Sequence, residues 1–224
     1  MIARELLGTA SVPGGEEELR LFRRGADHMI VLGRNELMSS RMSGSEEALA
    51  DMTLDRLGQR TAMGLLIGGY GMGFTLRAAL KRLGGDAKVT VAELVPEIVE
   101  WARGPMAAMT GDCLDDKRLF LDIADVGVLI GEADGYYDAI LLDVDNGPDG
   151  LTRKANNGLY SRKGLAGAKA ALKPGGILAI WSAAADEKFK KALGDAGFAV
   201  DEVAVRARQN GKGAKHVIWF AQRR

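Results

Sequence analysis

Cysteine and histidine are nearly absent from this sequence, and their scarcity limits the chemistry that it can support. The 224 residues include one cysteine, Cys113, and two histidines, His28 and His216. A single cysteine excludes a disulfide within the chain and a cysteine-based zinc site. The two histidines lie far apart and follow neither the H-x-x-x-H nor the H-E-x-x-H spacing, so the sequence predicts no metal centre.

Excess charge and long apolar segments are missing too. Lys and Arg number 30, as do Asp and Glu, so the formal net charge is zero. This balance lacks the electrostatic signature of a protein that binds nucleic acid or anionic membranes. There is no apolar run long enough to span a bilayer, and the first ten residues lack the layout of a signal peptide. We therefore expect a cytoplasmic protein without membrane or nucleic-acid partners.

The first part of the chain consists of short extended runs separated by turn residues. These runs cover residues 6–12, 19–23, 29–32 and 36–39, and glycine-containing turns lie between them. They predict a small β-hairpin domain over residues 1–43. Such a piece is too short for a core of its own, so it must pack on the rest of the chain or on a second subunit. The exposed strand edges favour a homodimer.

A helix marks the start of the main domain, which we assign to residues 44–224. Ser43 to Glu46 follows the S-x-x-E pattern of a capping box. The apolar residues that follow, through Leu57, have helical spacing and lead directly into a glycine-rich stretch.

That stretch, residues 64–83, has the order of a nucleotide-binding unit. The apolar run of residues 65–67 enters a turn with Gly68, Gly69, Gly71 and Gly73, and a helical pattern follows. A dinucleotide-binding turn needs a small residue where Phe74 stands, which argues against NAD or FAD. There is no phosphate-binding P-loop motif either. The spacing that remains, G-x-G-x-G, is that of enzymes that use S-adenosylmethionine (SAM).

Acidic residues follow three successive predicted strands. Glu93 comes 20 residues after Gly73, where a carboxylate accepts hydrogen bonds from a ribose diol. Asp125, preferred over Asp122, is suited to an adenine amino group. Asp143 ends the fourth strand, and the long loop that follows it, residues 144–157, lies over the expected site as a lid.

The rest of the chain continues the alternation of helices and strands. We expect a helix over residues 159–172, a turn over 173–176, a strand over 177–181 and a helix over 186–196. Two β runs, 198–205 and 216–221, flank a glycine-rich hairpin turn. The pattern predicts an α/β fold with a seven-stranded, mostly parallel sheet and helices on both faces.

Four segments together carry a family resemblance: residues 66–73, 91–97, 137–146 and 172–176. On these segments the chain, from about residue 44, resembles class I SAM-dependent methyltransferase-fold proteins, and among them the spermidine synthase-like proteins. The resemblance implies a Rossmann-like methyltransferase sheet whose last strand is antiparallel, preceded by a small β domain.

The resemblance also implies roles for individual residues. Asp143 and Asp145 would be catalytic, orienting and deprotonating an amine at the gate loop. Apart from the resemblance, the place of Tyr70 inside the glycine loop predicts that its ring lies beside the amino-acid end of the donor. The donor, SAM or decarboxylated SAM, would be held by Gly68, Gly69, Tyr70, Gly71, Gly73, Glu93, Leu94, Asp125 and Asp143.

Departures from the family pattern leave the reaction open. Spermidine synthases carry an aspartate in the glycine loop that binds the amino group of the aminopropyl chain, and Gly71 stands there in this sequence. Their Tyr-His-Glu cluster is replaced by residues 49–51, Leu-Ala-Asp. The main prediction is therefore a methyltransferase that acts on a small, amine-bearing molecule. The alternatives are a polyamine aminopropyltransferase and a SAM-binding protein without catalysis.

Overall fold

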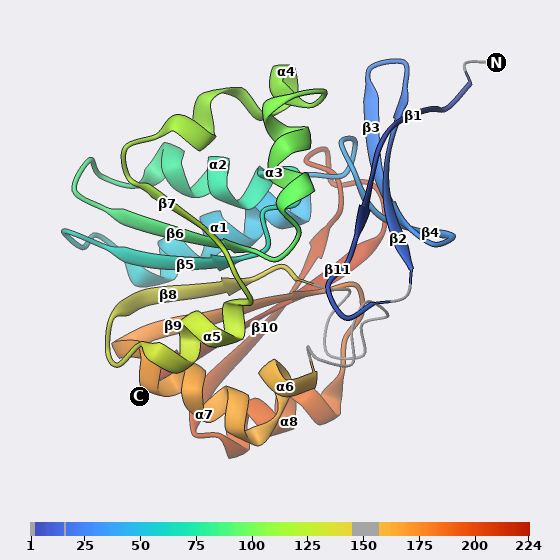
Figure 1. The fold of residues 1–224 in the computed structure, drawn as a ribbon. Coiled ribbons are helices and arrows are strands. Elements are labelled where there is room, and N and C mark those ends of the chain that lie inside the picture. Colours follow the sequence, from blue (N-terminus) through green and yellow to red (C-terminus); the bar gives the residue numbers. More distant parts are fainter. Residues whose placement is uncertain (1–2, 16, 145–156) are drawn as a thin grey trace.

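Two β-sheets organise the chain. The computed structural model describes residues 3–15, 17–144 and 157–224, and these form a four-stranded sheet and a seven-stranded sheet (Figure 1). The smaller sheet stands at one end of the larger one.

The four-stranded sheet is an antiparallel meander. Its strands, paired in chain order, are β1 (Glu5–Ser11), β2 (Glu18–Arg24), β3 (Asp27–Leu32) and β4 (Asn35–Ser39). Leu19, Leu21 and Ile30 are buried in the same apolar cluster as the main sheet. The small sheet therefore shares a core with the rest of the chain, as its length predicted, and the proposed boundary at residue 44 lies just after it.

The seven-stranded sheet has the order β10-β11-β9-β8-β5-β6-β7. Strands β5 to β9 are parallel to one another, and β11 is inserted antiparallel between β9 and β10. This confirms the predicted α/β fold and its reversed last strand. The strands are β5 (Gly64–Gly68), β6 (Lys88–Glu93), β7 (Leu119–Ile123), β8 (Tyr137–Leu142), β9 (Leu172–Ser182), β10 (Phe198–Arg206) and β11 (Lys215–Arg223).

Helices cover both faces of this sheet (Figure 1). One face carries α1 (Gly44–Leu57), α2 (Phe74–Arg82) and α3 (Pro96–Arg103). The other carries α5 (Val126–Glu132), α7 (Arg162–Ala171) and α8 (Glu187–Asp195). Three short pieces, α4 (Ala107–Thr110), η1 (Gly111–Asp115) and α6 (Asn157–Tyr160), complete the described helices.

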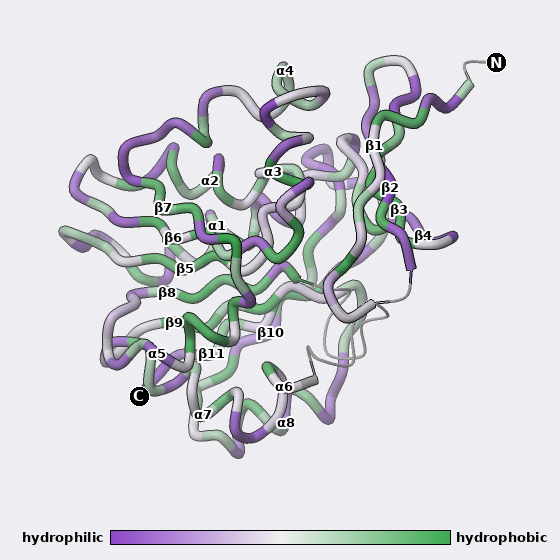
Figure 2. Tube along the Cα trace, viewed as in Figure 1, coloured by the Kyte–Doolittle hydropathy of each residue, from purple (hydrophilic) through white to green (hydrophobic). Residues whose placement is uncertain are grey.

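The central strands are hydrophobic on both sides because helices cover both faces. Every residue of β5 and β8 is buried, and Figure 2 shows the hydrophobic colour along them. Alternation divides their side chains between two cores. Leu65 and Ile67 pack on the α1–α3 side, whereas Leu66 packs on the side of α5, α7 and α8.

One predicted turn is absent. Residues 173–176, expected as a turn before the fifth strand, belong to β9, which begins at Leu172 directly after α7. The pairing of β8 with β9 shifts register between Tyr137 and Ala139, and Gly175 adopts φ 71°. The proline and glycines that suggested a turn therefore lie in the irregular first part of β9.

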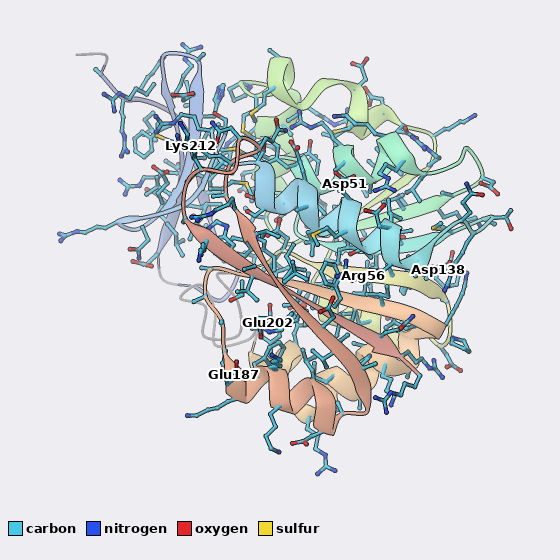
Figure 3. The ribbon with its side chains drawn as sticks, turned by 180° about the vertical axis from the view of Figure 1, so that it is seen from behind. Asp51, Arg56, Asp138, Glu187, Glu202 and Lys212 are labelled. Carbon is cyan, nitrogen blue, oxygen red and sulfur yellow. The ribbon has the colours of Figure 1, made fainter. Side chains whose placement is uncertain are left out.

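The amino end of β8 carries a buried ion cluster. Asp138 is 3% exposed, and it accepts hydrogen bonds from Arg60 at 2.9 Å, from Lys173 at 2.6 Å and from the Gly64 N–H at 2.9 Å. Asp138 lies far from the four-stranded sheet (Figure 3). This cluster therefore stabilises the sheet at the end opposite the site described below.

None of the helices in the described part of the chain combines the length and the apolar character needed to cross a membrane.

Candidate functional site

A cavity of about 300 Å³ lies where the four-stranded sheet meets the carboxyl ends of β5, β6, β7 and β8. Loops at this edge of a parallel sheet are where α/β proteins bind ligands. The small sheet and its link to α1 contribute one wall, with Leu37, Met38, Ser39 and Met42. The strand ends contribute the facing wall.

The charges in the lining are of one sign. Glu46, Glu93, Asp125 and Asp143 line the cavity, with the exposed Glu36 also in the lining. His216 is the one basic side chain in this lining, and the described residues place no lysine or arginine there. The cavity is therefore built for a cationic ligand.

The glycine loop allows close backbone contact at the cavity wall. Gly69 adopts φ 85°, and a Cβ there would lie 2.7 Å from the Asp143 carbonyl oxygen. Gly71 adopts φ 55°, and a Cβ there would meet the Met38 side chain at 2.8 Å. Both line the cavity. Gly68 ends β5 and Gly73 is the left-handed residue before α2, so these two shape the loop without lining the cavity.

The Tyr70 ring points away from the predicted donor site. It is 5% exposed, its hydroxyl lies 3.5 Å from Cys113 Sγ, and it is not part of the cavity lining. Burial, with the Cys113 hydrogen bond, raises the pKa of Tyr70 above its ordinary value. The expectation of a ring beside the donor's amino-acid end is thus not matched by the geometry. What Tyr70 contributes to the site is its backbone N–H, which donates to Glu93.

Glu93 is held rigidly at the end of β6. It is 4% exposed, and its carboxylate accepts hydrogen bonds from the N–H of Tyr70 at 2.8 Å and of Val95 at 2.9 Å. Burial raises the pKa of Glu93, while these N–H groups act in the opposite direction. The N–H groups of Gly71 and Leu94 also stabilise the charged form, so four backbone donors hold this carboxylate. The neighbouring Leu94 is half-buried and lines the cavity.

Asp125 lies at the next strand end. It precedes α5, and its Oδ1 accepts a hydrogen bond from the Gly127 N–H at 2.8 Å. Asp125 lines the cavity, whereas Asp122, the second choice for the same role, is exposed and does not.

Asp143 follows β8 and faces the same cavity. Thr75 Oγ1 lies 3.3 Å from its Oδ2 and donates a hydrogen bond. Burial raises the pKa of Asp143 to about 6, and the Thr75 hydrogen bond lowers it in part. The second predicted catalytic residue, Asp145, lies outside the described residues.

Glu46 is the site residue that the sequence did not reveal. The capping box predicted for Ser43 to Glu46 does not form, because the Ser43 side chain makes no capping hydrogen bond. Glu46 is instead 6% exposed and lines the cavity. Burial, together with the negative charge of Asp143, raises its pKa to about 8. In the sequence, the capping-box pattern already explained why an acid stands at position 46. Only the folded chain shows that Glu46 lies beside Asp143.

Residues 49–51, which replace the family's Tyr-His-Glu cluster, do not reach the cavity. Leu49 and Ala50 lie in the core, and Asp51 pairs with Arg82 at 3.6 Å on the surface. The acid that α1 contributes to the cavity therefore comes from its first turn.

No three His, Cys, Asp or Glu side chains of residues 3–15, 17–144 and 157–224 converge in a way that could hold a metal ion.

Comparison with protein families gives a match to the Spermine/spermidine synthase domain over residues 44–193, two thirds of the chain. The chain belongs to this family. The family is one of aminopropyltransferases that use decarboxylated SAM, and the resemblance predicted from the four sequence segments is thereby confirmed.

Solved structures match the same fold over nearly the whole chain. A spermidine synthase in complex with the transition state analogue AdoDATO has a TM-score of 0.74 and 18% identity, covering 98% of this chain and 72% of that one. Spermidine synthase from Thermotoga maritima has a TM-score of 0.73 and 17% identity, covering 98% of this chain and 72% of that one. A probable spermidine synthase from Corynebacterium glutamicum has a TM-score of 0.67 and 13% identity, covering 97% of this chain and 80% of that one. The comparison with curated proteins gave no match.

Proposed function

We propose that this protein is an aminopropyltransferase, which moves the aminopropyl group of decarboxylated SAM to a small amine. The supporting observation is the charge of the cavity, whose lining has five carboxyl groups and no lysine or arginine among the described residues. Decarboxylated SAM carries a sulfonium and an ammonium group and no carboxylate. SAM would bring its carboxylate into a lining of like charge, where the described residues offer no lysine or arginine to pair with it.

The residues divide between donor and acceptor. Glu93 and Asp125 would hold the ribose and the adenine of the donor at the ends of β6 and β7. The donor's sulfonium supplies an electrophilic carbon and a neutral thioether as the leaving group. The chain therefore has to align an amine with that carbon, exclude water and remove a proton.

Glu46 and Asp143 are suited to the acceptor. Their raised pKa values mean that the empty pair retains a proton that two separate carboxylates would lose. A cationic amine can replace that proton and restore both charges. One carboxylate then orients the ammonium group while the other accepts a proton from it.

Methyl transfer from SAM, the main prediction from the sequence, is the second candidate because of Gly71. Where spermidine synthases place an acid for the ammonium of the donor, this chain has no side chain, and Met38 packs against the position. A donor that depends on that acid would lose one partner.

Calorimetric binding of SAM and of decarboxylated SAM to the ligand-free protein tests the proposal. We expect tighter binding of decarboxylated SAM, and mass spectrometry should show aminopropyl transfer to at least one member of a panel of diamines. Tighter binding of SAM with methyl transfer would establish the second candidate. Binding of neither donor would refute both, and binding without transfer to any amine would indicate a binding protein without catalysis.

The other expectations from the sequence, a small-molecule acceptor, a homodimer and a cytoplasmic location, stay predictions.

A further inference from the structure

We propose that Ser45 and His216 form, with Glu46, a proton relay that carries the proton of the acceptor amine away from Glu46 to the half-buried His216. The inference rests on the proposed function in one respect, that the acceptor is an amine. It holds for either donor, because transfer from a sulfonium to a protonated amine always releases one proton.

The three side chains form a continuous chain of hydrogen-bonding atoms. Ser45 Oγ lies 2.6 Å from Glu46 Oε2 and 2.9 Å from His216 Nδ1. Both distances are those of good hydrogen bonds. Ser45 is fully buried and Glu46 is 6% exposed, whereas His216 is half-buried and follows the exposed Lys215. The chain therefore runs from a buried acid to a half-buried histidine, and both side chains line the cavity.

Ser45 and His216 are 171 positions apart along the chain, and the fold brings them into contact. The Gly44 N–H donates to the Ala207 carbonyl oxygen at 2.9 Å. A Cβ on Gly44 would lie 2.6 Å from the Arg208 backbone carbon. Glycine at this position thus lets the start of α1 lie directly on the β10–β11 hairpin, which holds Ser45 against His216.

The serine hydroxyl can serve both neighbours, but with one proton it can donate to only one at a time. When Glu46 is ionised, the hydroxyl donates to the carboxylate and His216 Nδ1–H donates to Ser45 Oγ. When Glu46 is protonated, its O–H donates to Ser45 Oγ and the hydroxyl donates to the Nδ1 lone pair of His216. The first state has the His216 ring proton on Nδ1 and the second has it on Nε2, so the ring exchanges its proton with solvent between them. The heavy-atom contacts are the same in both states, so the backbone does not move.

Ionised Glu46 takes a proton from the acceptor ammonium, and the neutral amine attacks the donor carbon. The C–N bond forms, the C–S bond breaks, and its electron pair leaves with sulfur in a neutral thioether. Glu46 passes its proton to Ser45 Oγ while the hydroxyl proton moves to His216 Nδ1. His216, doubly protonated for that moment, loses its Nε2 proton to solvent, which restores the state with ionised Glu46 and a proton on Nδ1.

The surroundings suit His216 to a transient role. Burial lowers the pKa of His216, so it does not retain the proton. The Trp181 ring packs edge-on against the imidazole, with centroids 4.7 Å apart. The charged groups near Glu46 in the described chain are Asp143 at the end of β8 and Glu47 on α1, with Glu36 of β4 in the same cavity lining. All three are acids, and Glu36 also pairs with Arg4 at 3.6 Å. The charges of Asp143 and Glu47 favour a cation beside Glu46.

The pH dependence of kcat in four variants tests the relay. Ser45→Ala removes the bridging hydroxyl and Ser45→Thr keeps it, while His216→Ala removes the last carrier. Glu47→Gln, the same type of acid on the adjacent position of α1, is the control. We expect Ser45→Ala and His216→Ala to lower kcat at least about 10-fold, within the range of general acid–base effects. Ser45→Thr should restore most of it, and added imidazole should restore His216→Ala. Donor affinity, measured by calorimetry, should not change.

Wild-type kcat and an unchanged pH profile in Ser45→Ala would overturn the relay while leaving the transferase function intact. If the wild type transfers nothing to any amine, the proposed function fails, and NMR of the ring nitrogens tests the relay separately. The chain has only two histidines, so the His216 signals can be assigned by comparison with His216→Ala. We expect Glu46→Gln to shift the His216 titration. An unchanged titration in Ser45→Ala and Glu46→Gln would overturn the relay.

Discussion

Replacing Glu46 by glutamine should change how the stability of the ligand-free protein depends on pH. The native pKa of Glu46 is about 8, against 4.5 as its ordinary value. The folded protein therefore holds a proton that the unfolded chain has lost. The stabilisation from this proton is complete below pH 4.5 and disappears as the pH rises through 8.

The size of the effect follows from the linkage. One proton of difference changes the free energy of unfolding by about 1.4 kcal/mol per pH unit. Between pH 6.5 and 8 the wild type should lose about 2 kcal/mol, which for a chain of this length lowers Tm by about 4–8 °C. This interval avoids the main titrations of Asp143, whose pKa is about 6, and of His216, whose pKa lies below its ordinary value.

Thermal unfolding in matched buffers is a sufficient assay. We expect Tm of the wild type to fall over this interval and Tm of Glu46→Gln to stay nearly constant, because the amide keeps the hydrogen bond from Ser45 and has no proton to lose. Glu47→Gln should retain the wild-type slope. Adding 1,4-diaminobutane at pH 8 should raise Tm of the wild type more than that of Glu46→Gln. A wild-type slope in Glu46→Gln would refute the burial argument for this acid.

Three further substitutions test other parts of the structure. Glu93→Gln should weaken donor binding about 10–100-fold, which corresponds to the loss of a charge-assisted hydrogen bond. Glu100→Gln, on the exposed face of α3, is the control and should leave donor binding unchanged. Calorimetry measures both affinities. Gly71→Asp together with Met38→Ala should increase the preference for decarboxylated SAM over SAM. Gly71→Asp alone should not, because the Met38 side chain occupies the position of the new Cβ. Asp138→Asn should lower the free energy of unfolding by about 2–3 kcal/mol. This loss is smaller than that for breaking a fully buried ion pair, because the partners of Asp138 are about a third exposed. Its donor affinity, measured at a temperature where the variant is folded, should equal that of the wild type.

The acids at the strand ends could be located from the sequence because the signals there are local. An apolar run followed by an acid predicts both a buried strand and the position of that acid at the carboxyl edge. Glu93, Asp125 and Asp143 follow this rule, and all three line the cavity. The glycine loop is equally local, since its positive φ angles at Gly69 and Gly71 exclude most other residues.

Two interpretations failed where a local pattern had a second explanation. The S-x-x-E motif before α1 matched a capping box, but the acid turns into the cavity, where Asp143 and Ser45 surround it. Tyr70 stands in the middle of the glycine loop, so its ring was expected beside the ligand. Its burial against Cys113 depends on how the segment of α4 and η1 packs on α2, which no spacing within the loop encodes.

The fold and the proposed donor half of the site could therefore be predicted from the sequence alone, because the period of apolar residues, the glycine spacing and the acids at strand ends act over a few neighbouring residues. The proposed acceptor half became visible only in the tertiary structure. Its wall comes from β4, the first turn of α1 and β11, and its central contact joins Ser45 to His216 across 171 positions. Contacts of that kind depend on how the two sheets pack, and such packing leaves no periodic pattern in the chain.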